Sequence, residues 1–202
     1  MKNVNYYMLM EEQLKNIEKS GCKRKLLLHC CCAPCSSHCL ELLNKYFEIT
    51  AYFYNPNITD NEEFEKRLNE LKRFVKQVYD ENDVNTYWET HESERFLEMA
   101  KGLENELERG ARCRKCYELR LDRSASFAKE HGYDYFTTTL SISPHKNAEW
   151  INEIGISLSE KYGIDFLYSD FKKKNGYKRS IELSAEYDLY RQNFCGCEFS
   201  RR

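Results

Sequence analysis

Cysteines dominate the residues of this chain that could carry out chemistry. Ten cysteines occur among 202 residues, and five of them lie in the stretch LLLHCCCAPCSSHC. Cys32 and Cys35 form a C-x-x-C pair directly after Cys31, and Cys113 and Cys116 form a second pair far downstream. A C-x-x-C turn places two sulfurs within reach of one metal centre. The two pairs together therefore predict at least one metal site.

The kind of metal follows from the spacing of these pairs. They lie too far apart along the chain for a zinc ribbon, whose two knuckles are separated by about 15–20 residues. A structural zinc that joins distant loops remains an alternative. Four thiolates gathered at the active edge of a sheet suit a [4Fe–4S] cluster better, and the chain has more thiols than one tetrahedral metal needs. We therefore expect a centre with redox chemistry.

A third cysteine pair lies near the C-terminal end, where Cys195 and Cys197 flank Gly196. The glycine allows a sharp backbone bend, so the two sulfurs can approach each other. Such a pair can close reversibly to a disulfide and release two electrons. We interpret it as a redox dithiol; the alternative is that both cysteines are further metal ligands.

Apolar runs that alternate with helical patterns predict the elements that position these cysteines. The N-terminal stretch is polar and helical in pattern. The expected strands are 25–30, 47–55, 84–90, 133–140 and 164–168. The expected helices are 36–46, 61–82, 92–107, 114–131, 146–162 and one near 179–189. Gly132 and Gly163 directly follow helical runs, as C-terminal caps do.

This alternation implies an α/β fold with an open, mainly parallel five-stranded sheet and helices on both faces. Ligands of such folds bind beyond the carboxyl ends of the strands, where the strand order reverses. The cysteine cluster follows the first strand, NPN follows the second and SISPHK follows the fourth, so we expect three loops to meet at one edge. The first turn holds cysteines in place of the glycines of a nucleotide-binding loop, which argues against NAD, flavin or ATP as the primary ligand.

Composition and charge narrow the function classes further. A formal charge of -2 excludes a broadly polycationic surface, so contacts with nucleic acid must come from local basic patches. The chain contains no apolar run of about 18 residues and no signal-peptide core, so we expect no membrane span. A cytoplasmic location follows as the expectation, where thiols stay reduced unless they bind metal or act in catalysis.

Two basic patches stand out against this acidic average. One surrounds the second C-x-x-C pair, and the other is the stretch DFKKKNGYKRS. Aromatic residues interleave with both and could stack on bases, a pattern that suits a bound RNA strand. The alternative is a pair of solvated charged faces. The candidate RNA-binding residues are Arg112, Lys115, Lys146, Lys172, Lys173, Lys174 and Arg179.

Two further positions have a structural interpretation. Ser143 is suited to cap a helix that has Pro144 at its first position, and this helix N-terminus could also attract an anion. His29 lies within the first apolar strand and is expected to be a packed core histidine.

Several motifs together resemble the QueH family of epoxyqueuosine reductases, from about residue 25 to the C-terminus. They are HCCCAPCS, YNPNI, RCRKCYELRL, DYFTTTLSISPHK, GIDFLYSDFKKKNGYKRS and YRQNFCGCEFS. The resemblance implies a Rossmann-like three-layer sandwich similar to adenine nucleotide α-hydrolases (HUP-like), as a single domain over 25–202. Residues 1–24 would be a helical extension.

The resemblance also implies the activity. Epoxyqueuosine at the wobble position of a tRNA would be reduced to queuosine, the last step of queuosine biosynthesis, without cobalamin. The implied partners are tRNAs with a GUN anticodon, which accept tyrosine, histidine, aspartate or asparagine, and an electron donor.

Residue roles follow from the same motifs. The implied [4Fe–4S] ligands are Cys31, Cys32, Cys113 and Cys116. Cys195 and Cys197 would be the redox-active pair, and Cys35 is a candidate ligand of an additional mononuclear iron or zinc. A third adjacent cysteine, Cys30, stands where a double cysteine is expected, which leaves open which neighbouring pair ligates the cluster.

Three other functions fit parts of the pattern. A cluster-containing tRNA thiolation enzyme would use ATP, against which the missing glycine-rich phosphate loop counts. A zinc-stabilised RNA-binding protein and a simple thiol–disulfide oxidoreductase are the other two.

Overall fold

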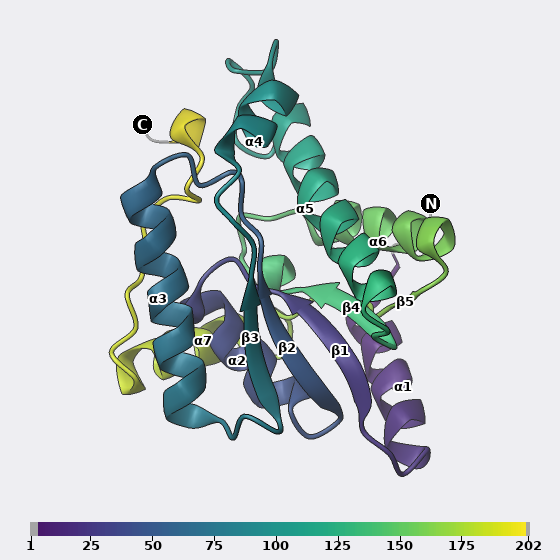
Figure 1. Cartoon of the computed structure of the whole chain (residues 1–202). Helices are drawn as coiled ribbons and strands as arrows, with labels where there is room; N and C mark the ends of the chain where they lie inside the picture. Colours follow the sequence, from purple (N-terminus) through teal and green to yellow (C-terminus); the bar gives the residue numbers. More distant parts are fainter. Residues whose placement is uncertain (1–3, 201–202) are drawn as a thin grey trace.

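The structure, a computed structural model, describes residues 4–200 and is built around one five-stranded sheet. Every neighbouring pair of strands is parallel, and the strand order is β3-β2-β1-β4-β5 (Figure 1). The strands are β1 (Arg24–His29), β2 (Phe47–Phe53), β3 (Val84–Trp88), β4 (Tyr135–Thr138) and β5 (Asp165–Phe166). The predicted α/β fold and its parallel sheet are therefore confirmed.

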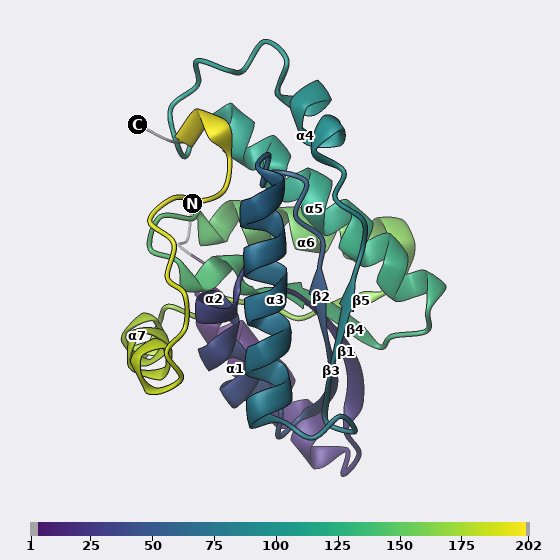
Figure 2. The same ribbon diagram turned by 60° about the vertical axis from the view of Figure 1, so that its left-hand side comes forward.

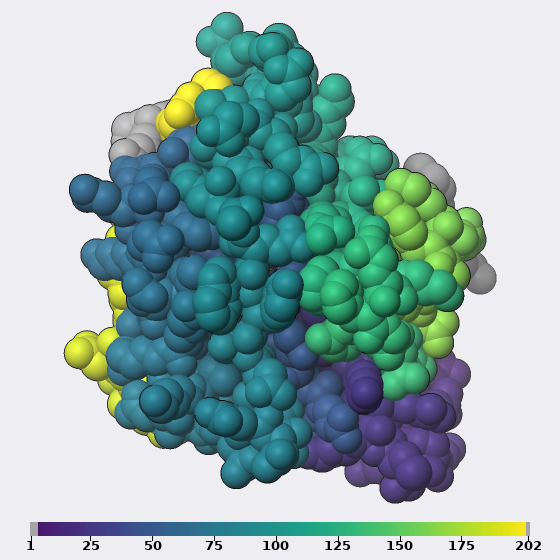
Figure 3. All heavy atoms as spheres, viewed as in Figure 1, coloured from purple at the N-terminus to yellow at the C-terminus, as the bar shows by residue number. Residues whose placement is uncertain are grey.

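Helices cover both faces of this sheet, which gives the Rossmann-like three-layer sandwich. They are α1 (Tyr6–Lys19), α2 (Ala33–Leu43), α3 (Asn61–Val78), α4 (Ser93–Ala100), α5 (Ala111–Glu130), α6 (Ala148–Tyr162) and α7 (Gly176–Glu186). Helices α1, α2, α3 and α7 pack on one face, whereas α5 and α6 pack on the other. Figure 3 shows a view in which side chains of α3 and of the segment 84–100 lie beside those of α5.

The core divides between the two faces because side chains of a strand alternate in direction. Leu26 and Leu28 of β1 belong to the cluster under α2 and α3, and Leu27 belongs to the cluster under α5 and α6. All three leucines are fully buried. A continuous apolar run is typical of a parallel strand that is covered on both faces, and β1 lies at the centre of the sheet.

Helix α3 shows how the sequence forms these elements. Phe64, Leu68 and Leu71 recur at helical spacing and are buried against the sheet. The Asp60 carboxylate caps the helix, because it accepts hydrogen bonds from the backbone N–H groups of Glu62 and Glu63, at 3.0 and 3.2 Å. The helix ends at Val78, four residues before the end of the predicted range 61–82.

Other boundaries differ from the predicted ones for local reasons. Helix α2 begins at Ala33 rather than at 36, because Cys32 is extended and Pro34 fits the first helical turn. Helix α4 stops at Ala100 rather than at 107. Gly163 adopts a φ of 62° and caps α6, as predicted.

The predicted cap at Ser143 is wrong. Helix α6 begins at Ala148, and the Asn147 side chain caps it by accepting a hydrogen bond from the Trp150 N–H at 3.2 Å. Ser143 accepts a hydrogen bond from the His145 N–H at 3.2 Å within the preceding turn.

The N-terminal stretch forms α1, whose apolar side packs into the core through Met10, Leu14 and Ile17. Gln13 donates to the Phe166 carbonyl at 3.0 Å and accepts from the Tyr168 N–H at 2.9 Å. A division of the chain at residue 24 stays a prediction. None of the helices within residues 4–200 combines the length and apolarity that a bilayer crossing requires.

Candidate metal and redox site

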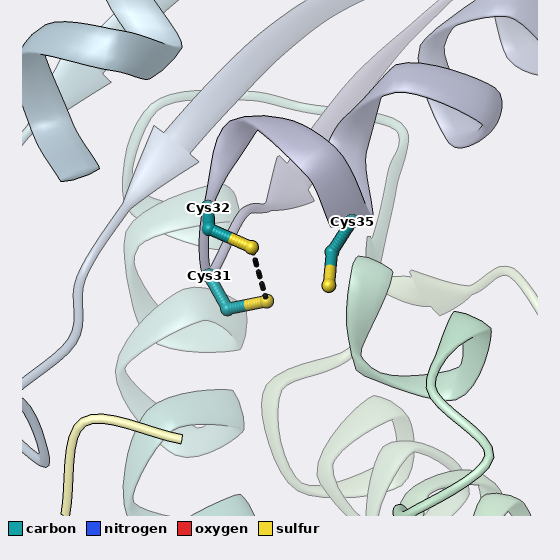
Figure 4. Close-up of side chains that lie close together, drawn as sticks. All are labelled: Cys31, Cys32 and Cys35. Atoms are coloured by element: carbon teal, nitrogen blue, oxygen red, sulfur yellow. Dashed lines mark hydrogen bonds between the residues drawn. The ribbon is translucent and has the colours of Figure 1, made fainter. Parts of the chain in front are cut away.

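Three cysteines gather at the turn between β1 and α2. The sulfurs of Cys31, Cys32 and Cys35 all lie within 4.8 Å of one another, and 3.8 Å separates the first two (Figure 4). Cys31 and Cys32 lie between the end of β1 and the start of α2, and Cys35 lies in the first turn of α2. The N-terminus of a helix favours negative charge, so this turn is suited to hold thiolates.

The neighbouring cysteines do not join this group. Cys30 is fully buried in the apolar core, and its sulfur lies 3.3 Å from the Leu28 carbonyl. Cys39 is buried in α2, where its thiol donates to the Cys35 carbonyl at 3.3 Å. The adjacent cysteines that face Cys35 are therefore Cys31 and Cys32.

The three thiols differ in acidity. The pKa of Cys31 is well below its ordinary value, because hydrogen bonds from Cys32 and Cys35 stabilise its thiolate. The hydrogen bond to Cys31 raises the pKa of Cys32 to about 12, and hydrogen bonds to Cys31 and Cys32 raise the pKa of Cys35. Burial and the negative charge of Cys31 add to both effects. Metal binding would displace the remaining protons, because metals bind the thiolate form.

Three loops meet at the carboxyl edge of the sheet, as predicted. Asn55, which follows β2, donates to the Cys30 carbonyl at 2.9 Å. Thr139, which follows β4, accepts from the Cys31 N–H at 3.4 Å. The chain continues from β1 to β2, whereas β4 lies on the other side of β1. The sulfur group therefore lies at the switch point, where ligands of open α/β sheets bind.

His29 is the buried core histidine that the sequence predicts. Its Nδ1 lies 2.7 Å from the Thr138 hydroxyl, and its Nε2 lies 3.1 Å from the Tyr54 carbonyl. Burial and the nearby charge of Arg120 lower its pKa to about 3.

The second C-x-x-C pair lies on α5. Cys113 and Cys116 lie outside the compact group of three sulfurs within the described residues. Cys113 packs at the edge of the same apolar cluster as Cys31, and Cys116 is buried in a small cluster with Cys197. The structure thus brings Cys35 closest to Cys31 and Cys32, whereas the ligand set that includes Cys113 and Cys116 stays a prediction.

The C-terminal pair lies on a segment that runs along α3 (Figure 2). Arg67 of α3 donates to the Cys195 carbonyl at 3.3 Å and to the Phe194 carbonyl at 3.2 Å. Asn57 donates to the same Cys195 carbonyl at 3.1 Å. The guanidinium of Arg67 is only 2% exposed and pairs with Glu63 at 2.6 Å. Buried polar contacts therefore position the dithiol.

Gly196 is required between the two cysteines. Its φ of 96° lies in the left-handed region, which side chains rarely adopt. A Cβ at this position would lie 2.7 Å from Cγ1 of Ile58, because the segment passes close to the loop after β2.

Both thiols of this pair are free, and they differ in acidity. A hydrogen bond from Cys197 holds the pKa of Cys195 well below its ordinary value; burial opposes this effect, and the charge of Lys146 and the Ser200 hydroxyl, 3.2 Å from the sulfur, support it. The pKa of Cys197 is raised by its hydrogen bond to Cys195 and by burial. Cys195 is therefore the more acidic thiol of the pair.

A cleft of about 320 Å³ connects these groups. Cys31 and Cys35 line it together with Cys195, so the sulfur group and the dithiol face one space. Arg120 and Lys146 bring two positive charges to its wall.

The basic candidates divide into structural and exposed residues. Arg112 is 1% exposed and donates to the carbonyls of 103, 104 and 106 at 2.8–2.9 Å, so it anchors the loop before α5 and does not lie on a surface that RNA could contact. Arg179 of α7 pairs with Glu41 of α2 at 2.6 Å. Lys172 forms an ion pair with Asp170.

The remaining lysines are available to a partner. Lys115, Lys173 and Lys174 are exposed and form no ion pair with any residue from 4 to 200. Lys146 is half-buried at the cleft, where the negative charge of Cys195 raises its pKa against the opposing effect of burial.

Sequence reasoning missed Arg67 as a site residue. A detectable signal existed, because this arginine interrupts the apolar side of α3 between Phe64 and Leu71. From the sequence, Asn55 and Asn57 could be placed only in a loop at the predicted edge of the sheet, because their hydrogen bonds depend on the fold.

The fold and the cleft together define a Rossmann-like α/β protein with a cleft lined by cysteine thiols. The family model described as Epoxyqueuosine reductase QueH matches residues 26–202, and the chain belongs to this family. Its relatives are named as reductases, a class of oxidoreductase.

Curated relatives named Epoxyqueuosine reductase QueH cover most of the chain. The one from Streptococcus pyogenes serotype M1 is 41% identical over 203 residues, which are 100% of this chain and 80% of the relative. The one from Staphylococcus epidermidis is 43% identical, over 99% of this chain and 87% of the relative. The one from Thermotoga maritima is 36% identical, over 87% of this chain and 89% of the relative.

Proposed function

We propose that this protein reduces epoxyqueuosine in tRNA to queuosine, the last step of queuosine biosynthesis. Family membership and the name of its relatives support the reaction. The observation that carries it is the cleft at the switch point, which Cys31, Cys35 and Cys195 all line. A thiol-rich site of this kind supports a reductive reaction on a substrate that enters between the two groups.

The sulfur group fits a thiolate-bound metal. Three thiol donors lie within 4.8 Å of one another at a helix N-terminus, a donor set that suits iron–sulfur centres and zinc. Cys31, Cys32, Cys113 and Cys116 would hold the [4Fe–4S] cluster, and Cys35 would be available to an additional mononuclear iron or zinc. Such a centre supplies a Lewis acid toward the epoxide oxygen and a path for electrons.

The dithiol of Cys195 and Cys197 can supply the electrons that this reduction consumes. Removal of the epoxide oxygen breaks two carbon–oxygen bonds, forms one carbon–carbon double bond, consumes two electrons and two protons, and releases water. Closure of Cys195 and Cys197 to a disulfide delivers the same two electrons. The Cys197 thiol supplies one proton, and solvent supplies the second when Cys195 reacts as the thiolate. Cys195 lines the cleft, and Cys197 is buried in an apolar cluster with Phe96 and Cys116. An external dithiol reductant would then reopen the disulfide.

RNA would reach the cleft through its anticodon loop. Proteins bind single-stranded loops with their bases splayed out, so the modified base can enter the cleft. The exposed lysines Lys115, Lys173 and Lys174 are positioned for phosphate contacts, and Lys146 lies at the cleft itself. The substrates would be cytoplasmic tRNAs with a GUN anticodon.

Anaerobic reconstitution with iron and sulfide tests this function. The reconstituted protein, given a dithiol reductant and an anticodon RNA that carries epoxyqueuosine, should remove one oxygen from the base, measured by mass spectrometry. Cys195→Ser and Cys197→Ser should keep the iron and lose turnover. The exposed Cys22 provides the matched control, because Cys22→Ser should leave both unchanged.

The proposal is refuted if neither the wild-type protein nor the Cys22→Ser control removes oxygen from the base. ATP-dependent sulfur incorporation into the RNA would favour a thiolation enzyme. A colourless zinc protein that binds RNA without turnover would favour an RNA-binding module.

A further inference from the structure

We propose that the buried guanidinium of Arg120 provides the positive charge of the thiolate site and fixes α5 to the β1–α2 turn. In this role it is a positioning residue whose charge stabilises a negatively charged metal–thiolate centre. The inference rests on the proposed function only in that the thiols hold a metal.

The placement of Arg120 links the two cysteine pairs. It lies four residues after Cys116 on α5, so it extends from the same side of the helix as that cysteine. Its guanidinium donates to Oδ1 of Asn55 at 2.6 Å, and Asn55 donates to the Cys30 carbonyl at 2.9 Å. One chain of hydrogen bonds thus connects the helix that carries Cys116 with the turn that carries Cys31.

The charge of Arg120 lacks a carboxylate partner. The side chain is 2% exposed, its Nε has no hydrogen-bond partner, and no acidic group from 4 to 200 forms an ion pair with it. By contrast, buried Arg67 pairs with Glu63 at 2.6 Å, and buried Arg112 donates to three backbone carbonyls. A buried guanidinium without a counter-charge is strongly unfavourable. The arrangement therefore indicates that an anion belongs beside Arg120.

The groups that can supply this negative charge are sulfurs. Arg120 and Cys31 line the same cleft, and buried Cys116 lies one turn before Arg120 on α5. A cluster with four thiolate ligands carries a net negative charge, which increases on reduction. A fixed cation in a dry site favours the more negative state, so Arg120 should raise the reduction potential of the centre.

Two variants separate charge from positioning. Arg120→Gln removes the charge, and Arg120→Lys keeps it but loses the planar fork. Arg123→Gln is the matched control on the same helix, because Arg123 is partly exposed and pairs with Glu89. Co²⁺ alone, added to the metal-free protein in a competition titration, reports the affinity of the thiols through its thiolate absorption band. The midpoint potential of the reconstituted iron centre gives the second measurement.

Arg120→Gln should weaken Co²⁺ binding about tenfold or more, and Arg123→Gln should change it less than twofold. The reduction equilibrium constant of the iron centre should fall about tenfold in Arg120→Gln, which is a shift of about 59 mV to more negative potential for a one-electron couple. Arg120→Lys should keep the potential of the wild type. If Arg120→Gln does not fold, Arg120→Lys decides. A reduction potential equal to that of the wild type supports the role of the positive charge, and a tenfold lower reduction equilibrium constant overturns it.

Equal Co²⁺ affinity and equal potential in Arg120→Gln and Arg123→Gln would overturn the inference, as would Co²⁺ binding without thiolate absorption in the wild type. Turnover on epoxyqueuosine RNA, measured in parallel, tests the proposed function separately. An Arg120-dependent potential without oxygen removal would refute the function and leave this inference standing.

Discussion

Replacing Arg67 with methionine should release the segment that carries Cys195 from α3. The substitution removes the donors to the carbonyls of Phe194 and Cys195 and leaves the Glu63 carboxylate buried without its cation. Loss of one partner of a buried ion pair costs about 3–5 kcal/mol. Glu63 keeps the Tyr190 hydroxyl as a donor at 3.1 Å, so we expect the lower end, about 3 kcal/mol.

Urea denaturation of the metal-free protein measures this loss, and turnover reports the position of the dithiol. Displacement of Cys195 by about 1 Å should reduce turnover by at least about tenfold. Arg73→Met on the same helix is the control, because Arg73 pairs with Glu70 while 43% exposed, and such exposed pairs contribute at most about 1 kcal/mol. A loss below about 1 kcal/mol in Arg67→Met, with turnover at the wild-type level, would refute the reasoning.

Three further predictions concern the sulfurs, the surface and the core. Cys113→Ala should lose the iron chromophore while Cys30→Ala keeps it, measured by absorbance after anaerobic reconstitution; equal loss in both variants would contradict the assigned ligands. Lys173→Glu combined with Lys174→Glu should weaken RNA binding and reduce its salt dependence, and unchanged affinity in a salt titration would show a merely solvated surface. His29 binds no proton in the folded state until the pH approaches 3, whereas the unfolded side chain titrates near 6.5, so between these values stability should fall as the pH falls, by about 1 kcal/mol from pH 7 to 5.5 in the metal-free protein. His29→Gln should abolish this part of the pH dependence, and an unchanged profile would exclude the histidine as its source.

The fold could be predicted from the sequence because its signals are local. The run of Leu26, Leu27 and Leu28 indicates a strand buried on both faces, and the repeat of Phe64, Leu68 and Leu71 indicates a helix with one apolar side. Element ends were less predictable. Helix α4 ends at Ala100 because the following loop is held by Arg112, whose contacts are formed with carbonyls up to nine residues away.

The candidate site was predictable in its chemistry and not in its geometry. Cysteine spacing indicated a metal centre, with Cys32 and Cys35 close together, and a dithiol. It did not reveal that Cys113 and Cys116 lie outside the compact group of three sulfurs within the described residues. Charge is equally ambiguous in a sequence. Arg112 and Lys115 stand in one basic patch, but the first is buried against carbonyls and the second is exposed.

The Gln13 side chain has a consequence for how copies of this chain meet. An edge strand of a sheet offers unpaired N–H and C=O groups to any extended peptide, which is a common route to aggregation. The Gln13 side-chain amide forms the same hydrogen bonds as such a peptide, because it donates to the Phe166 carbonyl and accepts from the Tyr168 N–H. Helix α1 thereby blocks growth of the sheet beyond β5, and this border is closed to strand-by-strand self-association.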